Sequence, residues 1–142
     1  MAKVISDRFF LRAIIISLSA LIAFHGMVLT GIVPFEIVWG EKIKNASQMY
    51  KLETISIIVN VLMLLICSIK AGNIKAAVNE KVINFLLWVM FVFFCLNTVG
   101  NLLSGSLTEK LIFTPVTILV AFFTYRVATS KRLKSQNTYQ RS

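Results

Sequence analysis

Four long apolar runs constrain this chain of 142 residues more than any other feature. They cover about residues 9–33, 52–69, 82–103 and 111–125. Crossing a hydrocarbon core of about 30 Å takes about 20 apolar residues, and the runs match this when tilt is allowed for. Because the bilayer interior offers no water, the backbone amides of each run must be satisfied within it, which predicts helices. The expected fold class is therefore all-α: a polytopic membrane protein with an antiparallel four-helix transmembrane bundle over residues 1–129.

The basic residues predict how this bundle is oriented, because Lys and Arg in short flanking segments are retained on the cytoplasmic side. With four spans, the two termini and the middle connection share one side. That side carries most of the 15 basic residues, namely Lys3, Arg8, Arg12, Lys70, Lys75, Lys81, Arg126, Lys131, Arg132, Lys134 and Arg141. The other side carries only Lys42, Lys44, Lys51 and Lys110. We therefore expect a protein of the inner membrane with both termini cytoplasmic and a basic, flexible tail over residues 130–142.

The net charge of +9 also raises the question of nucleic acid, since clustered Lys and Arg neutralise phosphates. Here the charge is divided among three segments that touch the membrane, where anionic headgroups are the nearest partners. Membrane lipids are therefore the expected partners, and nucleic acid is not.

Motifs for cofactors and metals do not occur in the sequence. There is no glycine-rich phosphate loop, no H-E-x-x-H and no Cys/His zinc spacing, and the chain has a single histidine. Cys67 and Cys95 are expected to differ in height by roughly 15 to 20 Å. A disulfide needs α-carbons within about 7 Å, so both cysteines are interpreted as small packing residues.

Polar residues within the runs are concentrated at one depth. His25, Asn60, Asn97 and Thr117 fall roughly 9 to 12 Å below the outer ends of their runs, one from each. Glu53 and Ser56 share a helical face with Asn60, and Asn101 lies one turn above Asn97. In the opposite halves of the runs, residues 14–16, 62–66, 85–94 and 118–123 carry no ionisable group. A path across the membrane needs polar lining along its whole length, so this pattern favours a pocket open to the outer side.

Two interpretations of this polar layer are open. Asn, Ser, Thr and His often join transmembrane helices by hydrogen bonds, which would make the layer structural. An ionisable residue inside a membrane is instead a functional hypothesis by default. Histidine changes charge near neutral pH, and Glu53 is a plausible partner for His25 at a shallower level. The candidate ligand-binding residues are His25, Glu53, Asn60, Asn97, Asn101 and Thr117.

The connections add further expectations. Pro34 disfavours helix at Val33, which would end the first span there, and the segment from Phe35 to Trp39 is expected to lie over the outer mouth of the bundle. The acidic residues on this side could bind a cation or a basic partner, namely Glu36, Glu41, Glu53 and Glu109. Residues 104–110 predict a tight antiparallel hairpin, with Thr108 and Glu109 capping the last helix and Pro115 in its first turn. The small residues Ser19, Ala23, Gly26 and Thr30 predict close helix packing.

Three segments carry a resemblance: Val33-Pro34-Phe35-Glu36-Ile37-Val38-Trp39-Gly40, Asn97-Thr98-Val99-Gly100-Asn101 and Glu109-Lys110-Leu111-Ile112-Phe113-Thr114-Pro115. They resemble segments of small four-span bacterial membrane proteins of uncharacterised function. In overall plan the chain is similar to the DoxX-like and EXPERA families, which are compact helical membrane proteins. EXPERA proteins are associated with sterol-like ligands, so this resemblance of architecture implies a lipophilic ligand.

The sequence therefore predicts a non-enzymatic binding or accessory protein without a cofactor. Its outward-facing polar pocket would hold a lipophilic ligand, or its aromatic faces would contact a membrane-protein partner or a second copy. One alternative is an enzyme acting on a lipid-like substrate, with His25 and Glu53 as acid and base. Another is a transporter subunit whose pathway is completed by oligomerisation.

Overall fold

The computed structural model describes residues 2–39 and 42–130, with side chains from Asp7 onward, and every regular element in these ranges is helical. The helices are α1 (Ala2–Leu29), α2 (Phe35–Trp39), α3 (Ala46–Ala71), α4 (Glu80–Leu102), the π-helical turn η2 (Glu109–Phe113) and α5 (Thr114–Ala128). Within the described ranges four helical segments are long and apolar enough to cross a membrane: Asp7–Leu29, Ala46–Ala71, Glu80–Leu102 and Glu109–Ala128. The predicted all-α, four-helix transmembrane fold is confirmed.

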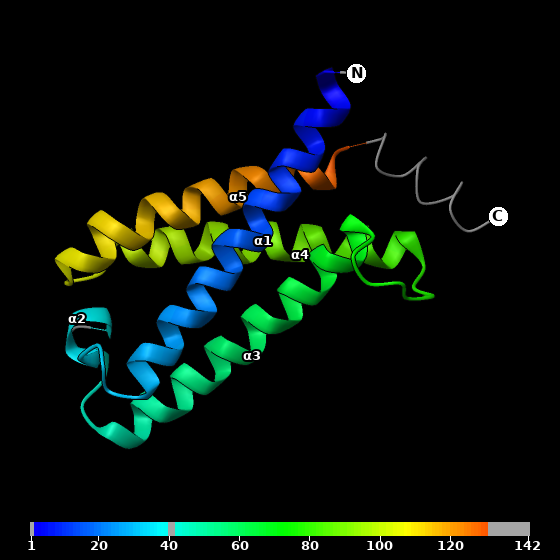
Figure 1. Cartoon of the computed structure of the whole chain (residues 1–142). Helices are drawn as coiled ribbons and strands as arrows, with labels where there is room; N and C mark the ends of the chain where they lie inside the picture. The colour runs from blue at the N-terminus through cyan, green and yellow to red at the C-terminus, as the bar shows by residue number, and fades with distance from the viewer. Residues whose placement is uncertain (1, 40–41, 131–142) are drawn as a thin grey trace.

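The four long helices form two antiparallel pairs that cross each other (Figure 1). α1 packs along α3, α4 packs along α5, and α1 also contacts α5 where the pairs cross. α3 and α4 make far fewer contacts, since they lie close only near the connection between them and diverge toward α2. We call the end of the bundle that carries α2 the α2 end, and the opposite end, where α1 begins and α5 finishes, the terminal end.

The apolar core fills the half of the bundle nearer the terminal end. Its fully buried members come from all four long helices: Leu11, Ile14, Leu18, Cys67, Leu87, Met90, Val120 and Val127. Between membrane-spanning helices, close packing of such side chains is a main favourable term that holds the helix pairs together. Cys67 lies in this core and both cysteines are free, as the sequence indicated.

Several of the predicted helix boundaries differ from the structure, and three of them have a clear physical reason. α1 ends at Leu29, not at Val33, because Gly31 adopts a left-handed φ of 78° and its N–H bonds to the Val28 carbonyl. A left-handed glycine is a common helix stop, and it acts before Pro34 is reached. α3 begins at Ala46, six residues before the apolar run, because the Asn45 side chain accepts a hydrogen bond from Gln48 N at 2.9 Å. An N-cap of this kind stabilises a polar first turn that hydropathy does not detect.

The start of the last helix also differs. Thr108 makes no capping hydrogen bond, so the predicted cap at Thr108 and Glu109 is wrong. Ser106 takes this position instead, and its Oγ accepts from Glu109 N at 3.4 Å. The helix then passes through η2, in which Thr114 N bonds to the Glu109 carbonyl, before Pro115 opens α5. Because proline lacks an N–H, a wider turn just before it sacrifices little hydrogen bonding.

The first turns of α1 and the residue that follows α5 and Thr129 are in contact at the terminal end. Ser130 Oγ donates to Asp7 Oδ2 at 2.7 Å, and Asp7 is buried, which sequence analysis did not predict. Of the predicted tail, residues 131–142 lie outside the described residues. The close helix packing predicted for the small residues Ser19, Ala23, Gly26 and Thr30 is absent at Gly26. A Cβ added at Gly26 would meet nothing within 4 Å.

Candidate functional site

A pocket of about 440 Å³ occupies the half of the bundle nearer the α2 end, where α3 and α4 diverge. Every long helix contributes to its wall, and α2 lies at its end. Its polar lining consists of His25, Trp39, Lys42, Ser56, Asn60, Asn97, Asn101, Glu109 and Thr117. Its apolar lining consists of Leu21, Val38, Ile55, Val59, Phe93, Phe94, Leu96 and Phe113. Such a mixture of apolar walls and a few convergent polar groups is typical of small-molecule sites.

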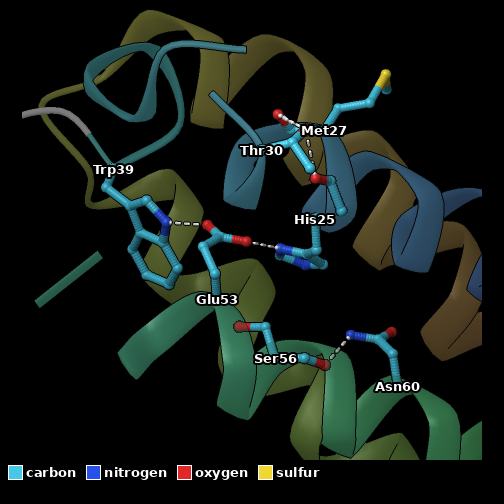
Figure 2. A network of polar contacts seen from close by, with 8 residues as sticks. His25, Met27, Thr30, Trp39, Glu53, Ser56 and Asn60 are labelled. Atoms are coloured by element: carbon cyan, nitrogen blue, oxygen red, sulfur yellow. Dashed lines mark hydrogen bonds and ion pairs between the residues drawn. The ribbon is translucent and has the colours of Figure 1, made fainter. Parts of the chain in front are cut away.

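Glu53 organises the polar side of the pocket. Its side chain is 0 % exposed, and each carboxylate oxygen has a donor: His25 Nδ1 lies 2.7 Å from Oε2, and Trp39 Nε1 donates to Oε1 at 2.5 Å (Figure 2). A buried carboxylate is tolerated only when its oxygens are paired in this way. The three residues come from α1, α2 and α3, so one carboxylate joins three helices.

His25 and Trp39 both line the pocket, and His25 is the ionisable one of the two. Its side chain is 14 % exposed, and its second ring nitrogen has no hydrogen-bond partner among the described residues. The contact with Glu53 fixes the ring, because the oxygen of an ionised carboxylate accepts and Nδ1 must then carry the proton. The second nitrogen is thereby left without a protein partner among the described residues.

Two further contacts fasten α2 and the loop after it across the end of the pocket. Ser106 Oγ donates to the carbonyl of Ile37 at 3.2 Å. Lys42 Nζ lies 2.7 Å from Glu109 Oε2, which ties the loop to η2. α2 is thus held to α3 through Trp39 and to the α4–α5 hairpin through Ser106.

The remaining polar residues bond within their own helices or to a neighbour. Asn60 Nδ2 donates to the Ser56 carbonyl at 2.8 Å (Figure 2), and Asn97 Nδ2 donates to the Phe93 carbonyl at 3.1 Å. Thr117 Oγ1 donates to backbone carbonyls of its own helix and accepts from Thr98 Oγ1 at 2.9 Å. In Asn60 and Asn97 the amide oxygen accepts no hydrogen bond among the described residues, while the nitrogen uses one of its two N–H groups.

Two buried acceptors of the pocket wall have no partner among the described residues: Asn60 Oδ1 and Glu109 Oε1. Asn60 is 8 % exposed and Glu109 is 3 % exposed. Both atoms are sealed from solvent, and leaving such an atom unsatisfied costs about 1–3 kcal/mol, and more for a charged group.

All six sequence-predicted site residues lie at this pocket. His25, Asn60, Asn97, Asn101 and Thr117 line it, and Glu53 lies behind His25. Trp39, Lys42 and Glu109 also contribute to the wall. Their positions depend on tertiary contacts between segments far apart in the chain, which spacing along the sequence does not show. Of the four acids considered as a cation site, Glu41 lies outside the described residues, and no three His, Cys, Asp or Glu side chains gather in the described part of the chain.

A second polar cluster lies near the terminal end. The Lys70 side chain is 0 % exposed and donates to Glu80 Oε1 at 3.3 Å and to Asn84 Oδ1 at 3.1 Å. It joins the end of α3 to the start of α4, where the two helices are closest. Sequence analysis counted Lys70 only as an orientation signal, since nothing in its neighbours indicates burial.

Comparison of the chain with protein-family models, curated proteins and solved structures finds no match.

Proposed function

We propose that this protein is a non-enzymatic binding protein that holds a lipophilic, lipid-like ligand in the pocket between α3 and α4. The observation that carries this proposal is the pocket itself, whose wall combines apolar side chains with a few polar groups. A ligand with a polar head and an apolar tail matches both parts.

The margin of the pocket supports access from the bilayer. Ile55 on α3 and Leu96 on α4 both line the pocket and are more than half exposed, at 56 % and 66 %. In a membrane such side chains contact lipid, so the opening between α3 and α4 borders the acyl region. The α2 end is meanwhile covered by α2 and the Lys42–Glu109 ion pair. We infer that an amphiphile enters sideways, head first.

The orientation expected from the basic residues completes the proposal. Both termini lie in the cytoplasm, the host membrane is the inner membrane, and the α2 end faces outward. The pocket then serves the outer leaflet.

Two rival functions receive less support. An enzyme would use His25 as acid or base with Glu53 positioning it. In that case a nucleophile or reacting group should lie against the imidazole, but the nearby Ser56 hydroxyl makes no hydrogen bond to His25 in the described structure. A transporter needs a path through the whole bundle, and the half near the terminal end is filled by the apolar core.

The test is native mass spectrometry of the protein purified in mild detergent, with a variant that fills the pocket. Gly100 lines the pocket, and a Cβ added there meets nothing within 4 Å, so Gly100→Leu places a side chain in the cavity without a backbone clash. Gly26→Leu is the matched control, because Gly26 has the same open space but does not line the pocket.

We expect a reproducible amphiphile mass on the wild type and on Gly26→Leu, and its loss from Gly100→Leu. A wild type without any such mass, or an equal mass on Gly100→Leu, would contradict the proposal. A co-purifying protein without a ligand would favour an accessory role instead.

A further inference from the structure

Two ion pairs near the α2 end share one arrangement, in which the acid is buried and the base is more exposed. The side chains of His25 and Glu53 are 14 % and 0 % exposed, and those of Lys42 and Glu109 are 48 % and 4 % exposed. Both bases line the pocket. Glu109 lines it too, but its Oε1 is sealed from solvent and its Oε2 is held by Lys42. In each pair the positive end is therefore the one within reach of a ligand.

His25 presents an N–H to the pocket. A carboxylate as deeply buried as that of Glu53 is tolerated when the charge beside it is matched, so the imidazole carries a proton on both nitrogens. If the shared proton moved to Glu53, Nδ1 would accept it and Nε2 would still carry its hydrogen. Nε2 keeps accessible surface and has no hydrogen-bond partner among the described residues. It is thus a donor that a ligand can reach.

Two neutral groups of the same wall can also donate. The Ser56 hydroxyl on α3 and the Asn101 amide on α4 line the pocket, are partly exposed and make no side-chain hydrogen bond in the described part of the chain. A head group that is rich in acceptor oxygens and negatively charged suits these donors and both bases. A cationic head group would instead meet an imidazolium and an ammonium.

Resting on the proposed function, we propose that the ligand is an anionic amphiphile, whose carboxylate or phosphate head accepts a hydrogen bond from His25 Nε2 and is attracted by the Lys42 ammonium. The tail leaves between Ile55 and Leu96 toward the bilayer. Hydrogen bonds that involve an ionised group are about twice as strong as neutral ones, so the charge of the head decides which amphiphile the pocket selects.

The experiment compares four probes with chains of equal length: laurate, dodecyl phosphate, methyl laurate and dodecylamine. The protein is held in nanodiscs of phosphatidylcholine, whose head group has no net charge. Binding is followed by the fluorescence of Trp39, which lines the pocket, in a Trp88→Phe background that leaves it as the one tryptophan of the chain.

The readout is the ratio of the methyl laurate Kd to the Kd of each anionic probe. Partition into the bilayer is the same for every variant, and a loss of stability affects both probes alike, so a change in this ratio reports the contact with the head group. His25→Gln can still donate to Glu53 but loses the cationic N–H, and it should lower the ratio about tenfold or more. Lys42→Gln should lower it about threefold, since Lys42 is half exposed and its charge is screened.

Lys44→Gln is the matched control. It removes the same charge two residues from Lys42, but Lys44 does not line the pocket, so the ratio should not change. Glu109→Gln gives the opposite sign, because it leaves the Lys42 ammonium without its counter-charge and should raise the ratio about threefold. Dodecylamine should bind more tightly to Lys42→Gln than to the wild type. The anionic probe with the larger wild-type ratio identifies the head as carboxylate or phosphate.

The failures are distinguishable. The inference is overturned if wild type, His25→Gln and Lys42→Gln give the same ratio, or if Lys44→Gln lowers it as much as Lys42→Gln. In either case, probe binding that Gly100→Leu abolishes leaves the proposed function standing. If no probe binds saturably, the proposed function fails together with this inference.

Discussion

The contact between His25 and Glu53 explains how a carboxylate tolerates complete burial between membrane-spanning helices. Both oxygens of Glu53 have donors, one from α1 and one from α2, so the cost of removing the charge from water is offset by two charge-assisted hydrogen bonds. Glu53 has no exposed surface with which to touch a ligand. We therefore regard it as a positioning residue for His25 and Trp39.

Removing the imidazole should destabilise the protein by leaving Glu53 Oε2 without its donor. We expect His25→Ala to lower the free energy of unfolding by about 1–3 kcal/mol, and His25→Gln, which can still donate, to lower it by less. Thermal unfolding in detergent, followed by circular dichroism, measures both. Ser19→Ala is the control, since the Ser19 hydroxyl bonds only to the Ile15 carbonyl of its own helix. Equal melting temperatures for wild type and His25→Ala would refute this role.

At the residue scale, the sequence predicted how deep the polar residues lie along their helices but not the direction in which their side chains point. Helical rise placed His25, Asn60, Asn97 and Thr117 at a common level, and these residues do line one pocket. Which way each side chain points depends on how the helix pairs cross, and spacing along a single helix carries no such information. The Lys42–Glu109 pair joins residues 67 apart in the chain, so it could not be anticipated.

At the scale of the elements, glycine conformation decides where α1 ends. Gly31→Ala should destabilise the protein by about 1–2 kcal/mol, because a residue with a Cβ resists the left-handed conformation held there. Gly26→Ala, in the same helix with open space around it, should be neutral or stabilising by up to about 1 kcal/mol. Chemical unfolding of both variants checks this, and a Gly31→Ala protein as stable as Gly26→Ala would argue against the observed turn.

The cap of the last helix gives a second prediction at this scale. Ser106→Ala should lower the free energy of unfolding by about 1 kcal/mol, since its hydroxyl accepts from Glu109 N and donates to the Ile37 carbonyl. Thr108→Ala should have little effect, because Thr108 makes no capping bond. Comparing the melting temperatures of the two variants shows which residue caps the helix. A larger loss for Thr108→Ala than for Ser106→Ala would support the cap at Thr108 that the sequence predicted.

Element types were predictable and their ends were not. The four apolar runs indicated four long helices because apolar length is a strong signal in a bilayer. The ends depend on polar and backbone features that hydropathy omits: the Asn45 cap, the left-handed Gly31 and the π-helical turn before Pro115.

Over the whole molecule, the division into a packed half and a hollow half follows from the crossing of the helix pairs. α3 and α4 converge near Lys70 and separate toward α2, so apolar side chains close one half and leave the other open (Figure 1). The sequence indicated this asymmetry, since the layer formed by His25, Asn60, Asn97 and Thr117 lies in one half of the runs. It did not indicate the sideways opening, which depends on the angle between the pairs.

The proposed orientation predicts that Lys44 lies outside and the C-terminus inside. Lys44→Cys should react with a membrane-impermeant maleimide in intact cells, and a green fluorescent protein fused to the C-terminus should fluoresce. The unsubstituted protein is the control, because Cys67 is buried and Cys95 is half buried. Labelling of Lys44→Cys only after the cells are broken would reverse the topology.

The most direct test of a pocket that opens to the bilayer is photo-crosslinking with a lipid whose acyl chain carries a diazirine, followed by peptide mapping. We expect labelling concentrated at residues 55–60 and 93–101, and its loss in Gly100→Leu but not in Gly26→Leu. Even labelling of every lipid-facing surface, including the exposed Ile118 and Leu119 on α5, with no change in Gly100→Leu, would contradict the account.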